Sequence, residues 1–245
     1  MDPLEPSAWF RIVDVMGVVA NGLLGGAVAR RMGFDIVGFA ILAVLSGLGG
    51  GLLRDVLLDV RPVALTDPAY ITGSLVAALI AYLLNLRGRW TGRVLVLADL
   101  LALGCWSATG TSKALVFGIA VLPAVLLGVL TAVGGGMLRD VFVGRVPAIF
   151  GGNPLYATVA VVGSLEMALF WHLRREEVGM LVAILTCTAL AGLARRRGWV
   201  LPGAADLEAR LRQVRMPQLR LPLRTARRRR RAERLHSEPG SDASA

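Results

Sequence analysis

Charged residues are scarce in this 245-residue sequence, which is 18% charged and 55% hydrophobic. The mean hydropathy of +0.63 excludes an ordinary soluble domain and indicates a membrane protein with several spans. Only two cysteines are present, and both Cys105 and Cys187 lie in apolar runs. We expect them to be packing residues and not a disulfide or a metal pair.

Motifs for catalysis are also missing. The sequence has no metal-ligand spacing, nucleophile elbow, phosphate loop or paired catalytic acids. We therefore expect no enzyme activity, no bound metal and no cofactor. The first residues, Met1 to Glu5, lack the basic region of a cleavable signal peptide, so the first apolar run is expected to be retained.

Positive charge is gathered at the C-terminal end of the chain. Residues 195–245 hold 14 arginines against five acids, whereas residues 1–194 hold 13 basic and 12 acidic residues. We predict a transmembrane domain over 1–194 and a basic, disordered cytoplasmic tail over 195–245, which has too few apolar residues for a core. The tail is expected to fix the topology and to attract anionic membrane lipids. It lacks the interleaved aromatic residues and recognisable fold that would indicate nucleic-acid binding.

Apolar runs long enough to cross a bilayer dominate the rest of the chain. A helical span needs about 20 mostly apolar residues. The sequence therefore predicts an all-α polytopic protein with seven transmembrane helices, at residues 9–29, 36–58, 69–86, 94–112, 115–143, 154–172 and 178–194.

One motif, Gly-Gly-Gly-x-Leu-Arg-Asp, occurs twice in these runs, at residues 49–55 and 134–140. The offset of 85 residues also aligns other pairs of residues. After one inserted residue in the second copy, the alignment continues at an offset of 86. Two three-span units, about 9–86 and 94–172, are thus repeated, and the span at 178–194 is added. Three is an odd number, so the second unit enters the membrane from the opposite side, as in an inverted repeat. The further aligned pairs include Asp14 with Asp99, Ser46 with Thr131, Gly33 with Gly118, and Tyr70 with Tyr156.

The glycine triplets are costly in a helix, since each glycine is about 1 kcal/mol worse than alanine. We predict that spans two and five are broken there and that the freed carbonyl groups face an ion path. Close helix packing is the alternative. Ser46 and Thr131 either line the same path or bond back to their own helices. The predicted breaks are Gly49, Gly50 and Gly51 in span two, and Gly134, Gly135 and Gly136 in span five.

Each triplet is followed by an Arg-Asp pair, Arg54-Asp55 and Arg139-Asp140. Adjacent residues do not face each other on a helix. Each arginine is therefore expected to find another partner, either the aspartate of the other repeat or an acid in another span. The alternative is a set of interfacial charges that close the helix ends.

Three further charged residues are candidates for the site. Asp14 and Asp99 either stabilise helix N-termini or line a cation vestibule. Lys113 is the only lysine in the chain and ends its most polar span. It either reaches the interface or is a gating charge, for which the membrane field supplies about 2.3 kcal/mol per 100 mV.

The loop charges set the orientation. Because the basic tail has the greatest weight, we place the N-terminus outside and the C-terminus in the cytoplasm.

The doubled glycine motif in an inverted repeat plus one span resembles the prokaryotic trimeric intracellular cation (TRIC) channels, over about residues 9–194. Sequences of this kind have also been classed as an uncharacterised membrane family and as glycine transporters. The resemblance implies homotrimers in a bacterial or archaeal inner membrane, with one pore per protomer between spans two and five. It implies permeation of potassium and also sodium. By motif, the six glycines carry over as the breaks, the two Arg-Asp pairs as linked charges, and Lys113 as a residue linked to gating.

A secondary transporter of glycine or another small amino acid is the main alternative. Such a site needs partners for both a carboxylate and an amine, and the sequence offers no obvious pocket of that kind. This favours a channel, whose sites release ions quickly. A scaffold or lipid-binding protein would leave the doubled glycine motif unexplained. No protein partner is predicted other than further copies of the chain.

Overall fold

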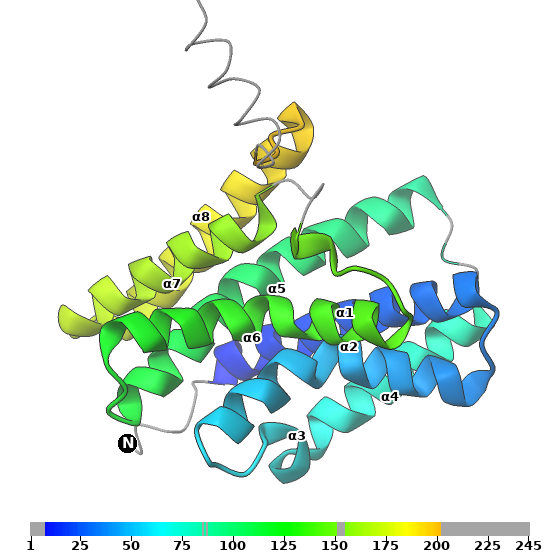
Figure 1. Ribbon diagram of the computed structural model, residues 1–245, viewed down its shortest axis with the longest axis horizontal. Coiled ribbons are helices and arrows are strands. Elements are labelled where there is room, and N and C mark those ends of the chain that lie inside the picture. Colours follow the sequence, from blue (N-terminus) through cyan, green and yellow to red (C-terminus); the bar gives the residue numbers. More distant parts are fainter. Residues whose placement is uncertain (1–7, 85, 87, 151–154, 202–245) are drawn as a thin grey trace, which may run out of the picture. The chain divides into compact units, whose positions relative to one another are not determined.

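The computed structural model describes residues 8–84, 86, 88–150 and 155–201, and these residues are helical throughout, apart from turns and links (Figure 1). The short elements α3 (Val63–Thr66) and η1 (Ala148–Phe150) follow α2 and α6. Most of the predicted tail lies outside the described residues. The long helices are α1 (Ala8–Met32), α2 (Ile36–Leu57), α4 (Pro68–Leu83), α5 (Arg89–Val116), α6 (Val121–Phe142), α7 (Tyr156–His172) and α8 (Glu176–Arg197).

Five of the described helices, α1, α2, α5, α6 and α8, are long and apolar enough to cross a membrane. The chain is therefore an all-α integral membrane protein. The other two long helices, α4 and α7, have 16 and 17 residues and are shorter than a typical span. The predicted number of seven spans therefore depends on these two helices.

The predicted helix bounds hold within a few residues, with two exceptions. The fifth span was expected from 115, but α5 continues to Val116 and α6 begins only at Val121. The reason is Gly118, whose φ of +75° ends α5 in the left-handed region that glycine tolerates. At its other end, α5 starts five residues before the predicted 94, at Arg89. The last described helix, α8, continues to Arg197, three residues beyond the predicted end of the span at 194.

The two repeats form two similar three-helix units. The first packs α1, α2 and α4 against one another, and the second packs α5, α6 and α7 in the same way. α8 packs on α5 and α7, beside which it lies in Figure 1. The units are joined where α1 contacts α5 and α2 contacts α6.

The crossing of α2 and α6 is a contact between backbones. A Cβ atom added to Gly50 would lie far inside van der Waals contact with the carbonyl oxygen of Thr131. A Cβ atom added to Gly135 would meet the carbonyl oxygen of Ser46 in the same way. Residue 46 meets 135 while residue 50 meets 131, so the two helices run antiparallel. This is the arrangement that an inverted repeat requires.

The helices do not break at their glycines. α2 continues from Ile36 to Leu57 and α6 from Val121 to Phe142 without interruption. The prediction of broken helices is therefore not confirmed, and the alternative of close packing describes this structure. The glycines are needed because two helix backbones touch here, and any side chain at Gly50 or Gly135 would force them apart.

Neighbouring glycines of one triplet should respond oppositely to alanine. Gly50→Ala and Gly135→Ala should destabilise the fold by about 1–3 kcal/mol or more, because the methyl group meets a rigid backbone carbonyl. Gly51→Ala and Gly136→Ala are the matched controls. Their nearest contacts would be arginine Nη2 atoms at 3.9 and 3.7 Å, so they should be neutral or stabilising by up to about 1 kcal/mol. Thermal unfolding in detergent, followed by circular dichroism and size-exclusion chromatography, would measure the difference. Equal stability of Gly50→Ala and Gly51→Ala would contradict the backbone contact.

A salt bridge near the helix ends ties the first turn of α1 to the start of α4. Asp67 caps α4 by accepting from the amide of Ala69 at 3.0 Å. Its carboxylate also accepts two hydrogen bonds from the Arg11 guanidinium, at 2.6 and 2.9 Å. The Arg11 hydrogen bond holds the pKa of Asp67 below its usual range. The stabilisation is therefore complete at neutral pH and is lost as the pH falls through the lowered pKa.

Asp67→Asn keeps a capping side chain but removes the ion pair. We expect a small decrease in melting temperature at pH 7 that disappears when the pH falls well below about 4, the ordinary aspartate pKa. Arg11→Gln should lower the melting temperature by the same amount, and the double variant by no more than either. Additive effects of the two substitutions would mean that the pair does not act as a unit.

Candidate functional site

Two cavities lie on opposite sides of the α2–α6 crossing. One is lined by the C-terminal half of α2 and the other by the C-terminal half of α6. Because the two helices are antiparallel, these halves point toward opposite ends of the bundle. The first, here the Trp106 cavity, is lined by residues that include Asp14, Gly51, Arg54, Asp55, Tyr70 and Trp106. The second, here the Asn21 cavity, is lined by residues that include Asn21, Asp99, Gly136, Arg139, Asp140 and Tyr156.

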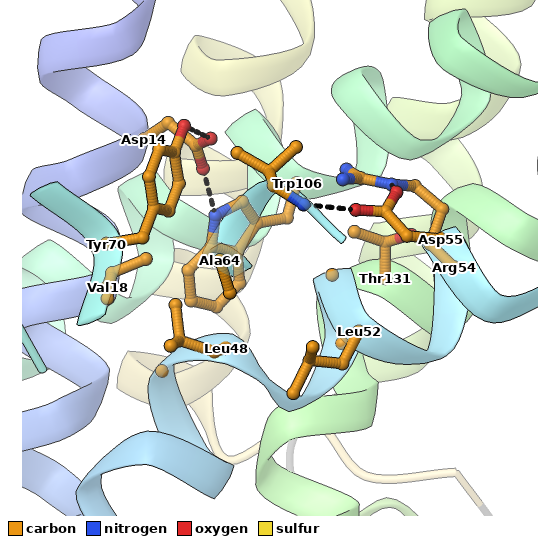
Figure 2. Close-up of a pocket in the computed structure, with 14 residues that line it drawn as sticks. Asp14, Val18, Leu48, Leu52, Arg54, Asp55, Ala64, Tyr70, Trp106 and Thr131 are labelled. Atoms are coloured by element: carbon orange, nitrogen blue, oxygen red, sulfur yellow. Dashed lines mark hydrogen bonds and ion pairs between the residues drawn. The ribbon is translucent and has the colours of Figure 1, made fainter. Parts of the chain in front are cut away.

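The Trp106 cavity is small, with a volume of about 30 Å³. At its α1 side, the two carboxylate oxygens of Asp14 accept from the Tyr70 hydroxyl and from Trp106 Nε1, both at 2.6 Å (Figure 2). The three side chains come from α4, α1 and α5 and converge on one point. A carboxylate that accepts two such bonds is satisfied although it lies between helices.

Asp55 holds the other side of the same cavity together. Its Oδ1 accepts from Arg54 Nε at 2.7 Å and from Lys113 Nζ at 2.8 Å. Its Oδ2 accepts from the amide of Val63, the first residue of α3, at 2.9 Å. The Asp55 side chain is 1% exposed and the Arg54 side chain 7%. Such buried charges need close partners, because removing each ion from water costs on the order of several kcal/mol.

The Asn21 cavity repeats this arrangement with looser contacts. Asp140 Oδ1 accepts from Arg139 Nε at 2.9 Å, and its Oδ2 accepts from the amide of Ala148, the first residue of η1, at 3.3 Å. Asp99 accepts from the Tyr156 hydroxyl at 3.0 Å and faces Arg195 of α8 at 3.7 Å. The volume is about 260 Å³, much larger than that of the Trp106 cavity.

The crossing between the cavities is lined by two small hydroxyl side chains, Ser46 and Thr131, which are 0% and 2% exposed. Thr131 donates back to the carbonyl of Leu127 in its own helix at 2.7 Å. Ser46 accepts from Arg139 of the other repeat at 3.4 Å. The hydroxyl groups and the glycine backbones therefore meet between the two cavities.

Comparison with known proteins places this arrangement in a family. A family model described as "Glycine transporter" matches residues 11–85 and 96–172, which are the two repeats. A solved structure of a TRIC cation channel superposes with a TM-score of 0.73 at 32% identity, covering 79% of this chain and 96% of that channel. The chain belongs to the TRIC channel family.

Other proteins are similar to this chain over much of its length. The TRIC orthologue from Rhodobacter sphaeroides superposes with a TM-score of 0.71 at 27% identity, covering 78% of this chain and 100% of that one. A "UPF0126 membrane protein" of Deinococcus radiodurans is 33% identical over 154 residues, 62% of this chain and 72% of that protein. The inner membrane protein YadS of Escherichia coli is 30% identical over 162 residues, 65% and 78% of the two chains. The family that the sequence motifs resembled is thus confirmed.

The TRIC fold corrects two expectations about the charged residues. Arg54 and Arg139 were expected to bind partners other than the adjacent aspartate, but each forms a salt bridge with that aspartate. The arginine side chain is long enough for its guanidinium group to reach the adjacent carboxylate, although the two residues point in different directions from the helix. Asp14 and Asp99 were weighed as helix N-terminal acids. They lie beyond the first turns of α1 and α5, which begin at residues 8 and 89, and accept from tyrosine side chains instead.

The structure also brings in residues that the sequence reasoning did not place at the site, namely Tyr70, Tyr156, Trp106 and Arg195. A signal for the tyrosines was present, because two of the three tyrosines in the chain align in the repeat. Trp106 and Arg195 carried no such signal, since their contacts depend on how α5 and α8 pack. Lys113 does not simply reach the interface, because its Nζ is bound to Asp55 and its side chain is 20% exposed.

The two Arg-Asp pairs should differ in how much stability they carry. Asp55→Ala leaves both Arg54 and Lys113 without their carboxylate and should cost about 3–5 kcal/mol. Asp140→Ala is the matched variant of the other repeat. Its side chain is 13% exposed and that of Arg139 is 17%, so water can replace the lost contact and the cost should be about 1–3 kcal/mol. Thermal unfolding of the two variants in the same detergent checks this order, and the reverse order would contradict the account of Asp55.

Proposed function

We propose that this protein is a monovalent cation channel that passes potassium and also sodium, with one path through each protomer of a homotrimer. In this proposal α4 and α7 also cross the membrane, which gives seven spans. The observation that carries the proposal is the pair of carboxylate-bearing cavities at opposite ends of the α2–α6 crossing. An ion that enters either cavity meets an aspartate first and the backbone crossing next.

The proposed path joins the Trp106 cavity, the crossing and the Asn21 cavity. Its ion-pathway residues are the glycines of both triplets together with Ser46 and Thr131. At Gly50 and Gly135 the backbones touch, so the path is closed at this point. A small separation of α2 and α6, together with a displacement of the Leu53 and Leu138 side chains that lie against Gly134 and Gly49, would open it. The carbonyl oxygens of Ser46 and Thr131 would then face the ion, and carbonyl groups are suitable weak ligands for potassium.

We further propose that Lys113 is a gating charge. Its ammonium group neutralises Asp55 in the Trp106 cavity, where Arg54 also binds the same oxygen. Displacement of Lys113 would leave Asp55 with one cation less and would make the cavity more attractive to a permeating cation. A charge that moves through part of the membrane field gains energy in proportion to the voltage, about 2.3 kcal/mol per 100 mV for the whole field.

The relatives support this function and the location. The solved TRIC structures are described as cation channels, and one is described as trimeric. YadS is described as an inner membrane protein, and we propose the same membrane here, with the N-terminus outside and the C-terminus in the cytoplasm. With this orientation the arginines of the predicted tail are on the side of the membrane whose anionic head groups attract arginine.

A specific observation also favours a second function, the transport of a small amino acid such as glycine. The Asn21 cavity is about 260 Å³ and is lined by both guanidinium and carboxylate groups. Arg139 or Arg195 could bind a carboxylate, and Asp99 or Asp140 could bind an ammonium group. This is the kind of pocket that the sequence did not reveal, and it agrees with the name of the matching family model.

Recording from the purified protein in planar bilayers separates the two functions. We expect step-like potassium and sodium currents that glycine leaves unchanged. Saturable glycine uptake into proteoliposomes, without such currents, would overturn the channel and support the transporter.

Lys113→Gln should make the open probability depend less steeply on voltage, because the moving charge is removed. Arg61→Gln is the control, since this exposed basic residue follows the same end of α2. An unchanged voltage dependence in Lys113→Gln would exclude Lys113 as the gating charge while leaving the channel function intact.

A further inference from the structure

Trp106 is one large side chain by which the two ends of the path differ. The repeat offset of 85 residues pairs Trp106 of α5 with Asn21 of α1. The cavity at Trp106 has a volume of about 30 Å³ and the cavity at Asn21 about 260 Å³. The motif residues around them are otherwise the same in type, with an aspartate, a tyrosine and an Arg-Asp pair at each end.

Trp106 is held firmly in the small cavity. It is 8% exposed, and its Nε1 donates to Asp14 at 2.6 Å. Its ring lies against Gly17 of α1, where an added Cβ atom would be 3.3 Å from the indole. Figure 2 shows the indole with its nitrogen toward Asp14. The position of the ring is therefore fixed from two sides.

Asn21 leaves the equivalent space open. Its Nδ2 donates to the carbonyl of Gly17 in its own helix at 3.4 Å and does not fill the cavity. Asp99 accepts from the hydroxyl of Tyr156 and faces Arg195 at 3.7 Å. The exchange of an indole for a short amide therefore contributes to the difference in volume between the two ends.

We propose that Trp106 limits the size of the cation that can pass, so that the path has a narrow end at Trp106 and a wide end at Asn21. This inference rests on the proposed channel function. A volume of about 30 Å³ leaves room for only about one or two water molecules, since a single water needs at least about 10–15 Å³. A cation crosses this end with few of its waters, and the carboxylate of Asp14 and the face of the indole replace part of its hydration. The wide end admits the same cation with its water shell.

The test uses organic cations of increasing size as probes of the narrow end. Permeability relative to potassium is measured under bi-ionic conditions for ammonium, methylammonium and dimethylammonium, with the full chain in planar bilayers. Trp106→Asn gives the narrow end the residue of the wide end. It should raise the relative permeability of methylammonium by about tenfold. Trp106→Phe keeps a ring against Gly17 but removes the Nε1 donor and one ring, and it should give a smaller increase of the same sign.

Trp90→Asn is the matched control, because Trp90 lies on the same helix and is 76% exposed. It should leave every permeability ratio unchanged. Folded Trp106→Asn and Trp106→Phe proteins with wild-type ratios would overturn the inference. Loss of folded protein in both variants would overturn it as well, since Trp106 would then be a packing residue only. A wild-type protein without cation currents would instead refute the proposed function, before any variant is compared.

Discussion

The contact between the backbones of α2 and α6 is the constraint on which the rest of this structure depends. Gly50 lies on the carbonyl of Thr131, and Gly135 lies on the carbonyl of Ser46. Dispersion contacts and small residues favour such an approach in a membrane, where burial of apolar surface between helices gains little. Once this crossing is fixed, the C-terminal half of each helix points to an opposite end of the bundle. The two Arg-Asp pairs and their cavities are thereby separated by the crossing.

The same local chemistry then satisfies the buried charges at both ends. Each motif aspartate binds its neighbouring arginine and the first amide of the short element that follows. Each aspartate of α1 or α5 binds a tyrosine from α4 or α7. Charges inside a membrane are expensive unless they are paired. The repeat therefore carries its own set of partners, and the two ends can differ only through residues outside the motif, such as Trp106 and Lys113.

Much of the fold and part of the site were predictable from particular residues. The apolar runs predicted the helices. The odd number of spans in each repeat predicted the antiparallel crossing, and the doubled motif indicated the family. Asp14 and Asp99 were recognised as a pair, but not their partners. The predicted break at the glycines was not found. A glycine in the sequence shows only that the position has no side chain, and it does not show which structural feature requires this. A bend and a close contact both need glycine.

The sequence by itself determined the membrane environment, the repeat and the residue types that carry charge at each end. These depend on local composition and on spacing along one chain. The tertiary structure decided that the glycine triplet is a contact and not a break in the structure described here. It also decided that Arg54 binds Asp55, and that an indole fills one cavity while the equivalent space stays open. These outcomes depend on which side chains meet across helices. The spacing of residues along one helix does not determine where another helix packs against it.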